Sequence, residues 1–254
     1  MIRIVRIEVN GVEYYARAEG HGFHLLTAAP WAGGRDVGAV VGNGRLLAPV
    51  QPSKVVCVGS NYRAHAAEMG KATPDKPRLF LKPPSAIIGP GQPIEIPPET
   101  TRVDHEVELG VVIGKRCSRV CKEDALDYVY GYTVCNDVTA RDFQKEDGLF
   151  ARAKGFDSFL PVGPHVVTGL VPERLALGCD VNRKVRQMGN TTDMVFPVAE
   201  LIAFMSNVMT LEPGDLILTG TPSGVGPLEA GDRVTVTVEG VGSMTNPVVD
   251  RSDR

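Results

Sequence analysis

The chain has 254 residues, of which 43% are hydrophobic and 22% are charged, and its formal net charge is −3 at pH 7. This balance is typical of a globular protein with a sizeable core, and it gives no electrostatic case for binding nucleic acid or an anionic membrane surface. No apolar run approaches the roughly 18 residues that span a bilayer, and the N-terminus does not read as a signal peptide. We therefore expect a cytoplasmic protein, with five scattered cysteines that are reduced thiols.

The first fifty residues have the pattern of a small β unit. Apolar and polar residues alternate over 2–9, and Asn10 followed by Gly11 is a strong turn signal before a second alternating segment at 12–16. No cluster of chemically reactive side chains occurs there. We predict a small N-terminal β domain over residues 1–52 and a larger domain over 53–254.

A short apolar strand is predicted at 55–59, followed by an alanine-rich helix at 62–69 with Ser60 and Asn61 as its candidate caps. In this helix His65 and Glu68 are three residues apart and lie on one face. Such a pair is either a surface contact or a histidine base that the carboxylate orients, and the pattern leaves both open. A further strand at 79–81 places Lys82 at its end.

The segment 102–115 begins with polar and acidic residues and continues as a β-branched strand. Glu106 and Glu108 flank Val107, so in a strand their carboxylates share one face while Val107 points to the other. Two such carboxylates repel each other unless a cation lies between them. The pair therefore indicates either a solvated strand face or a site for a hard cation such as Mg²⁺, Mn²⁺ or Ca²⁺.

Later in the chain we predict a helix at 121–129 capped by Ser118, a strand at 130–137 that ends in Asp137, and a strand at 162–168. A helix at 197–209, a strand at 216–218 with a glycine-rich loop after it, and a strand at 233–239 follow. Asp137 joins Glu106 and Glu108 as a third carboxylate near a strand end. Three carboxylates with water make a normal shell for Mg²⁺ or Mn²⁺.

Six segments, in their order along the chain, together resemble the fumarylacetoacetate hydrolase family. They are 58–68, 80–83, 104–110, 136–142, 154–157 and 219–226. The resemblance covers about 54–248 and implies a mixed α+β, β-rich fold, in which twisted mixed sheets form a β-roll with few helices. It also implies a homodimer.

By this resemblance, the metal ligands are Glu106, Glu108 and Asp137, binding Mg²⁺ or Mn²⁺ with Ca²⁺ as a possible substitute. The catalytic residues are His65 and Glu68, a dyad on a helical lid, and Lys154, which reaches the metal-bound oxygens. The substrate contacts are Arg141, Gln144 and Thr221. Asp104 and His105 precede the metal glutamates, where they either support those ligands or have a structural role.

The resemblance implies a divalent-metal-dependent hydrolase that cleaves a C–C bond of acylpyruvate-type 2-oxo acids through a metal-bound pyruvate enolate. The same site without an attacking water can act as an isomerase, a tautomerase or a decarboxylase on 2-oxo or 2-hydroxy-diene dioates, including oxaloacetate. A catalytically silent metabolite-binding relative is a third hypothesis. It predicts a broken carboxylate triad or dyad, and both are intact.

Overall fold

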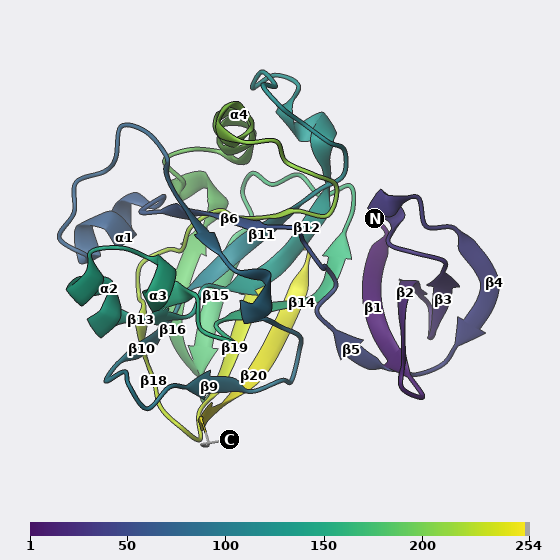
Figure 1. The fold of residues 1–254 in the computed structure, drawn as a ribbon, viewed down its shortest axis with the longest axis horizontal. Helices are drawn as coiled ribbons and strands as arrows, with labels where there is room; N and C mark the ends of the chain where they lie inside the picture. Colours follow the sequence, from purple (N-terminus) through teal and green to yellow (C-terminus); the bar gives the residue numbers. More distant parts are fainter. Residues whose placement is uncertain (252–254) are drawn as a thin grey trace.

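The N-terminal part of the chain is an antiparallel β meander in the computed structural model, which describes residues 1–251 (Figure 1). Asn10 and Gly11 both have positive φ and form the turn between its first two strands, as the sequence predicts. Apolar side chains on alternate positions make a small core of their own. The strands are β1 (Arg3–Val9), β2 (Val12–Glu19), β3 (Gly22–Leu26), β4 (Asp36–Val41) and β5 (Arg45–Leu47).

This N-terminal unit continues the largest sheet of the molecule. β1 pairs antiparallel with β14, with Arg3 opposite Val167, so the sheet runs without a break from the N-terminal unit into the rest of the chain. The domain division at residue 52 stays a prediction. The remaining strands of this sheet are β14 (Leu160–Val167), β12 (Val129–Asn136), β11 (Val107–Ile113), β17 (Leu216–Leu218), β6 (Val55–Gly59), β7 (Arg78–Lys82) and β8 (Ile87–Ile88).

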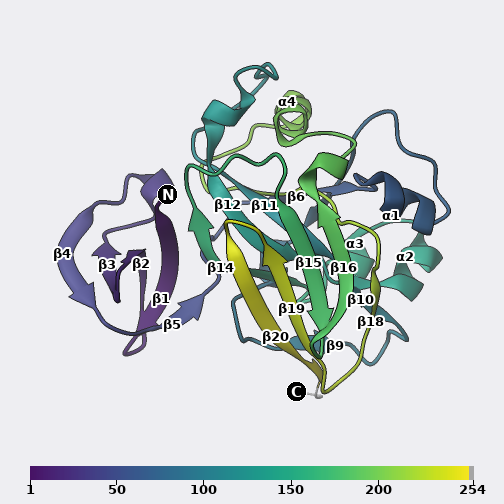
Figure 2. The ribbon, with the colours of Figure 1, turned by 180° about the vertical axis from the view of Figure 1, so that it is seen from behind.

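The central strands of this sheet are buried on both faces, which explains why β6 and β17 are uninterrupted apolar runs and why Glu108 is the one charged residue of β11. On one face, side chains such as Val107 and Leu109 join the main core with Val234 and Val236 of a second sheet. Figure 2 shows this second sheet in front of the first. Its strands, in spatial order, are β16 (Lys184–Asn190), β15 (Ala176–Val181), β19 (Arg233–Val238), β20 (Gly242–Asp250) and β9 (Ile94–Ile96).

The helices are few and short, and α1 and α2 lie on the side of the molecule away from the N-terminal unit (Figures 1 and 2). A small third sheet lies on the same side of the molecule (Figure 1). Its strands are β13 (Thr139–Ala140), β10 (Val103–His105) and β18 (Gly226–Leu228). The helices are α1 (Arg63–Glu68), α2 (Arg141–Asp147), α3 (Ala151–Lys154) and α4 (Val198–Val208), with 3-10 turns at Pro30–Ala32, Pro84–Ala86, Ala125–Tyr128 and Thr191–Asp193.

The predicted β-rich fold of mixed sheets with few helices is confirmed, because parallel and antiparallel pairs occur in the same sheet. No helix within residues 1–251 has the length and apolar character needed to cross a membrane.

The helix predicted at 121–129 is wrong. Only a 3-10 turn forms at Ala125–Tyr128, and Ala125 is its one buried residue. A segment that short gains little helix stability without an apolar face to bury. Ser118 therefore caps no helix, and Val129 begins a strand instead.

The predicted caps of α1 are also wrong. Tyr62 occupies the N-cap position, and its side chain makes no capping bond. The side chain of Asn61 instead accepts a bond from the Phe196 amide and donates to the Phe196 and Thr219 carbonyls, which ties α1 to the loop after β17. Asn61 is wholly buried, so these distant backbone groups take precedence over a local cap.

Candidate active site

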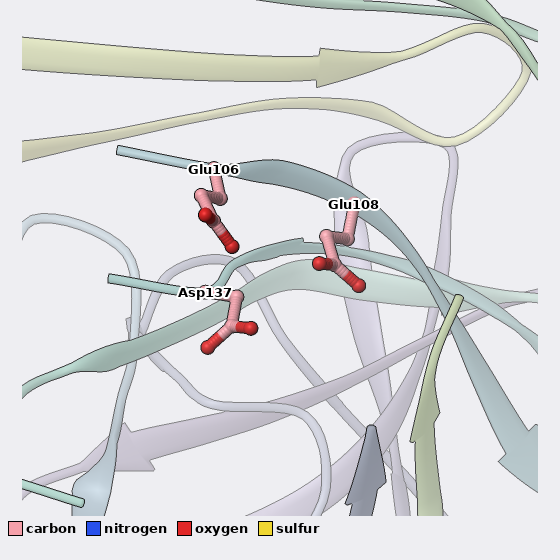
Figure 3. A group of neighbouring side chains, drawn as sticks. All are labelled: Glu106, Glu108 and Asp137. Atoms are coloured by element: carbon pink, nitrogen blue, oxygen red, sulfur yellow. The ribbon is translucent and has the colours of Figure 1, made fainter. Parts of the chain in front are cut away.

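Three carboxylates meet where β11 begins and β12 ends. The two strands are antiparallel, with Val107 opposite Asn136, so the start of one lies beside the end of the other. Figure 3 shows Glu106, Glu108 and Asp137 pointing into one space, and each offers an oxygen within 4.8 Å of the others. Val107 points the other way, into the main core, as the strand period predicts.

This cluster is buried. Glu106 is 4%, Glu108 2% and Asp137 1% exposed, which excludes the solvated strand face as an interpretation of the glutamate pair. Buried carboxylates are costly unless cations or hydrogen bonds compensate them.

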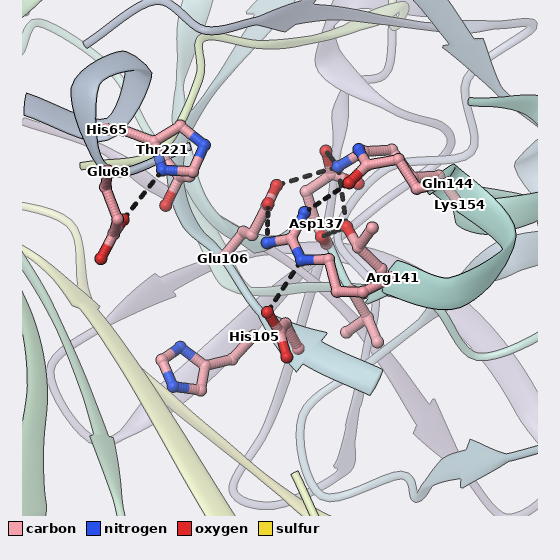
Figure 4. Close-up of polar contacts among 12 residues, drawn as sticks. His65, Glu68, His105, Glu106, Asp137, Arg141, Gln144, Lys154 and Thr221 are labelled. Atoms are coloured by element: carbon pink, nitrogen blue, oxygen red, sulfur yellow. Dashed lines mark hydrogen bonds and ion pairs between the residues drawn. The ribbon is translucent and has the colours of Figure 1, made fainter. Parts of the chain in front are cut away.

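Two lysines and an arginine contact Glu106 and Asp137. Figure 4 shows two of these cations, Lys154 and Arg141, beside the carboxylates. Lys154 Nζ donates to Glu106 Oε2 at 2.9 Å and to Asp137 Oδ2 at 2.6 Å. Lys82 Nζ lies 2.7 Å from Asp137 Oδ1, and Arg141 Nη2 lies 2.5 Å from Glu106 Oε1. Both oxygens of Asp137 and both of Glu106 therefore have a cationic partner.

Glu108 differs from its neighbours because its only hydrogen-bond donor in the described chain is the Gly220 amide, at 2.6 Å. Burial, followed by the charges of Asp137 and Glu106, raises the pKa of Glu108. Burial acts in the same direction on Glu106, but the nearby charges of Lys154 and Arg141 outweigh it and lower the pKa of Glu106. Two glutamates on one strand face thus have opposite shifts.

The two lysines also differ, although both contact Asp137. Burial lowers the pKa of Lys82, which has this one carboxylate as partner, whereas two carboxylates outweigh burial and raise the pKa of Lys154. The number of carboxylate partners explains the difference.

The His65 and Glu68 side chains are in contact on α1. His65 Nδ1 lies 3.3 Å from Glu68 Oε2, and Glu68 Oε1 accepts a bond from the Gly224 amide at 2.9 Å. His65 is only 7% exposed, so its imidazole is buried, whereas the side chain of Glu68 is 33% exposed and reaches the ring from the surface. The Gly224 bond links α1 to the glycine-rich loop.

One pocket of about 400 Å³, measured to include its open mouth, brings these groups together. Every predicted site residue except Glu68 lines it, and Glu68 lines the adjoining outer pocket. The residues of the inner pocket include His65, Glu106, Glu108, Asp137, Arg141, Gln144, Lys154 and Thr221. Their grouping is a structural fact, whereas the individual roles stay predictions.

Arg141 is fixed by neighbours on three sides. Its Nε donates to Asp104 Oδ2 at 2.8 Å, its Nη1 donates to Gln144 Oε1 at 3.0 Å, and Glu106 binds Nη2. Asp104 also binds Arg102 at 2.8 Å. Asp104 therefore holds Arg141 in place beside Glu106.

Two contributors to the site are not among the residues that the sequence predicts to have a role there. Lys82 lies at the end of β7, and its pairing with Asp137 depends on β6, β7 and β12 lying in one sheet. Gln187, from the second sheet, accepts a bond from the Val107 amide, and no local pattern distinguishes it. Lys82 lies within segment 80–83, one of the six segments that resemble the family, so the sequence does contain a signal for it.

The donor set fits a divalent cation such as Mg²⁺ or Mn²⁺. Hard carboxylate oxygens suit these ions, and three of them converge here. Glu108, buried and without a cationic side chain, is the kind of ligand whose charge such an ion would balance.

The comparison with known families identifies the class of protein. The family model described as fumarylacetoacetate (FAA) hydrolase C-terminal matches residues 54–249. The chain therefore belongs to the fumarylacetoacetate hydrolase family, a family of enzymes, and the predicted family membership and β-roll are confirmed.

Relatives within the family are named for different reactions. The oxaloacetate tautomerase YisK of Bacillus subtilis is 44% identical, and the match covers 80% of this chain and 73% of that protein. The crystal structure of 2-hydroxyhepta-2,4-diene-1,7-dioate isomerase from Mycobacterium marinum superposes with a TM-score of 0.92 at 44% identity, over the whole of both chains. The crystal structure of fumarylpyruvate hydrolase from Pseudomonas aeruginosa, in complex with Mn²⁺ and pyruvate, superposes with a TM-score of 0.76 at 34% identity. This match covers 83% of this chain and 94% of that chain.

Proposed function

We propose that this protein is a divalent-metal-dependent enzyme that interconverts the enol and keto forms of a 2-oxo dicarboxylic acid such as oxaloacetate. The observation that carries the proposal is one pocket in which the buried carboxylate cluster faces the oriented His65. A relative named as an oxaloacetate tautomerase is 44% identical, which supports this reaction over the hydrolysis favoured by the sequence alone.

Glu106, Glu108 and Asp137 would hold Mg²⁺ or Mn²⁺, with Ca²⁺ as a substitute. When bound, such an ion acts as a Lewis acid toward a 2-oxo carboxylate and eases the loss of the neighbouring C–H proton. Lys154 adds fixed positive charge at the same place, because it lies within hydrogen-bond distance of both Glu106 and Asp137.

His65 is suited to move that proton. A carboxylate can only accept, so the Nδ1 atom that faces Glu68 carries a hydrogen, and the neutral ring then has a lone pair at Nε2. Glu68 is itself held by the Gly224 amide and so fixes the ring. Arg141, Gln144 and Thr221 line the pocket as partners for substrate oxygens.

C–C hydrolysis of an acylpyruvate is the second candidate. The solved structure of a fumarylpyruvate hydrolase at 34% identity favours it, and the same His65 base could activate a water molecule. Homodimer formation and a cytoplasmic location stay predictions.

The first test is an assay of oxaloacetate tautomerisation and decarboxylation, with acetylpyruvate and fumarylpyruvate hydrolysis, in Mg²⁺, in Mn²⁺ and in EDTA. We expect metal-dependent tautomerisation. Turnover that persists in EDTA would reject the metal mechanism, and hydrolysis as the faster reaction would favour the second candidate.

The second test separates the base from the metal site. His65→Ala should lower turnover by ~100-fold or more, the usual size of general-base catalysis, while Mn²⁺ affinity stays unchanged. His21→Ala, at an exposed turn, is the control and should retain full activity. Full activity in His65→Ala would remove His65 from the mechanism.

A further inference from the structure

Gln187 is a buried amide that connects the strand of the two glutamates to the glycine-rich loop. It lies on β16 and is 1% exposed. Its Oε1 atom accepts from the Val107 amide at 3.1 Å and faces His105 Nδ1 at 2.9 Å. Its Nε2 atom donates to Thr221 Oγ1 at 2.8 Å and to the Pro222 carbonyl at 2.9 Å. One side chain thus connects the backbone between Glu106 and Glu108 to Thr221, which lines the pocket.

The backbone contacts of Gln187 fix the direction of every bond in this network. A backbone N–H only donates and a carbonyl only accepts, so the oxygen of the amide must face Val107 and the nitrogen must face Pro222. His105 therefore donates from Nδ1. The amide nitrogen has two hydrogens, and Pro222 and Thr221 receive them.

The hydroxyl of Thr221 is consequently an acceptor toward Gln187, and its own hydrogen remains to be donated. No oxygen within residues 1–251 is its acceptor. Thr221 is 3% exposed and lines the pocket with His65 and Glu108, so a ligand in the pocket is the available acceptor.

We propose that Gln187 is a positioning residue that holds the Thr221 hydroxyl as a hydrogen-bond donor to an anionic oxygen of the 2-oxo acid. The inference rests on the proposed function for the identity of the ligand. It explains why an amide is needed at position 187, because only a side chain with both an acceptor and two donors satisfies Val107, Pro222 and Thr221 together.

The test uses oxalate, an anionic mimic of the enol form of pyruvate, and the Mn²⁺-loaded protein, with affinity measured by calorimetry. Thr221→Val should weaken oxalate binding ~10-fold or more, as expected for loss of a hydrogen bond to a charged group. Gln187→Met should weaken it less. Gln187→Glu should weaken it as much as Thr221→Val, because the new carboxylate accepts the hydroxyl hydrogen and turns it away from the ligand.

A purely structural role for Gln187 predicts the opposite order, since glutamate keeps the length of the side chain and the acceptor for Val107. A second explanation for weaker binding in Gln187→Glu is that its added negative charge repels oxalate at a distance. The double variant Gln187→Glu with Thr221→Val distinguishes this explanation from the proposal. We expect it to bind no more weakly than Thr221→Val alone. Losses that add, or wild-type affinity in Gln187→Glu, would overturn the proposal.

Asn246→Leu is the matched control for stability. Asn246 is a buried amide that donates to the Gly89 and Gln92 carbonyls and does not line the pocket, so its loss should lower the melting temperature and leave oxalate affinity unchanged.

Failure of the proposed function gives a different result from failure of this inference. A wild-type protein that binds Mn²⁺ but not oxalate would reject the 2-oxo acid as ligand. The crystal structure of Gln187→Met then decides the role of Gln187 without a ligand, because the Thr221 side chain should leave its present rotamer. An unchanged rotamer would overturn the positioning role.

Discussion

The two sides of the carboxylate cluster differ in what balances their charge. On one side, Glu106 and Asp137 are bound by Lys82, Lys154 and Arg141. On the other, the one hydrogen-bond donor to Glu108 among residues 1–251 is the backbone amide of Gly220. The difference shows how a fold can concentrate three carboxylates in its interior. Fixed cations balance two of the carboxylates, and we propose that a divalent cation would balance the third.

The largest expected effect is on the side with fixed cations. Lys82→Met leaves Asp137 Oδ1 buried without its cation, and removal of one partner of a buried pair costs about 3–5 kcal/mol. We expect a loss of that size in the free energy of unfolding, measured by urea denaturation in EDTA. A loss below about 1 kcal/mol, the value of an exposed pair, would contradict the importance of this contact.

The next largest effect is expected at Glu108, the carboxylate without a cationic side-chain partner in the described chain. Glu108→Gln keeps the shape of the side chain and removes the charge that a cation would balance, so Mn²⁺ affinity should fall ~100-fold or more by calorimetry. Glu106→Gln should also lose affinity. Glu200→Gln, on the exposed face of α4, is the control and should bind Mn²⁺ like the wild type. Unchanged affinity in Glu108→Gln would remove it from the ligand set.

The raised pKa of Glu108 also makes the stability of the metal-free protein depend on pH. The folded protein holds this proton at pH values where the unfolded chain, with a carboxyl pKa of about 4.3, has lost it. The stabilising contribution is therefore complete below that pH and is lost as pH rises toward the folded-state pKa, by about 1.4 kcal/mol for each pH unit.

Urea denaturation in EDTA, from about pH 5 to 8, measures this slope. Glu108→Gln should flatten it, and an unchanged slope would show that another group titrates. The lowered pKa of Glu106 has the opposite sign, because its contribution is present above the ordinary carboxyl pKa and is lost as pH falls below it.

The smallest effect is expected at an exposed ion pair. Lys122 and Glu200 lie 2.6 Å apart, but their side chains are 52% and 39% exposed. Lys122→Met should change the free energy of unfolding by less than about 1 kcal/mol. A loss as large as that of Lys82→Met would mean that burial is not what separates the two pairs.

Local sequence patterns were sufficient to predict how side chains are arranged along the elements that build the site. Alternation placed Glu106 and Glu108 on one face and Val107 on the other, and the structure agrees. The three-residue spacing of His65 and Glu68 similarly predicted their contact. These features depend on the helix and strand periods, which neighbouring residues determine by themselves.

Only the tertiary structure decided the features that depend on distant pairing. The 3-10 turn at Ala125–Tyr128 replaced a predicted helix because no apolar face was available for burial, and Asn61 left its predicted cap to bind Phe196 and Thr219. The contacts of Lys82 with Asp137 and of Gln187 with Thr221 join residues 55 and 34 positions apart. Buried polar groups take whichever partners the packed sheets bring near, and no local pattern records which these are.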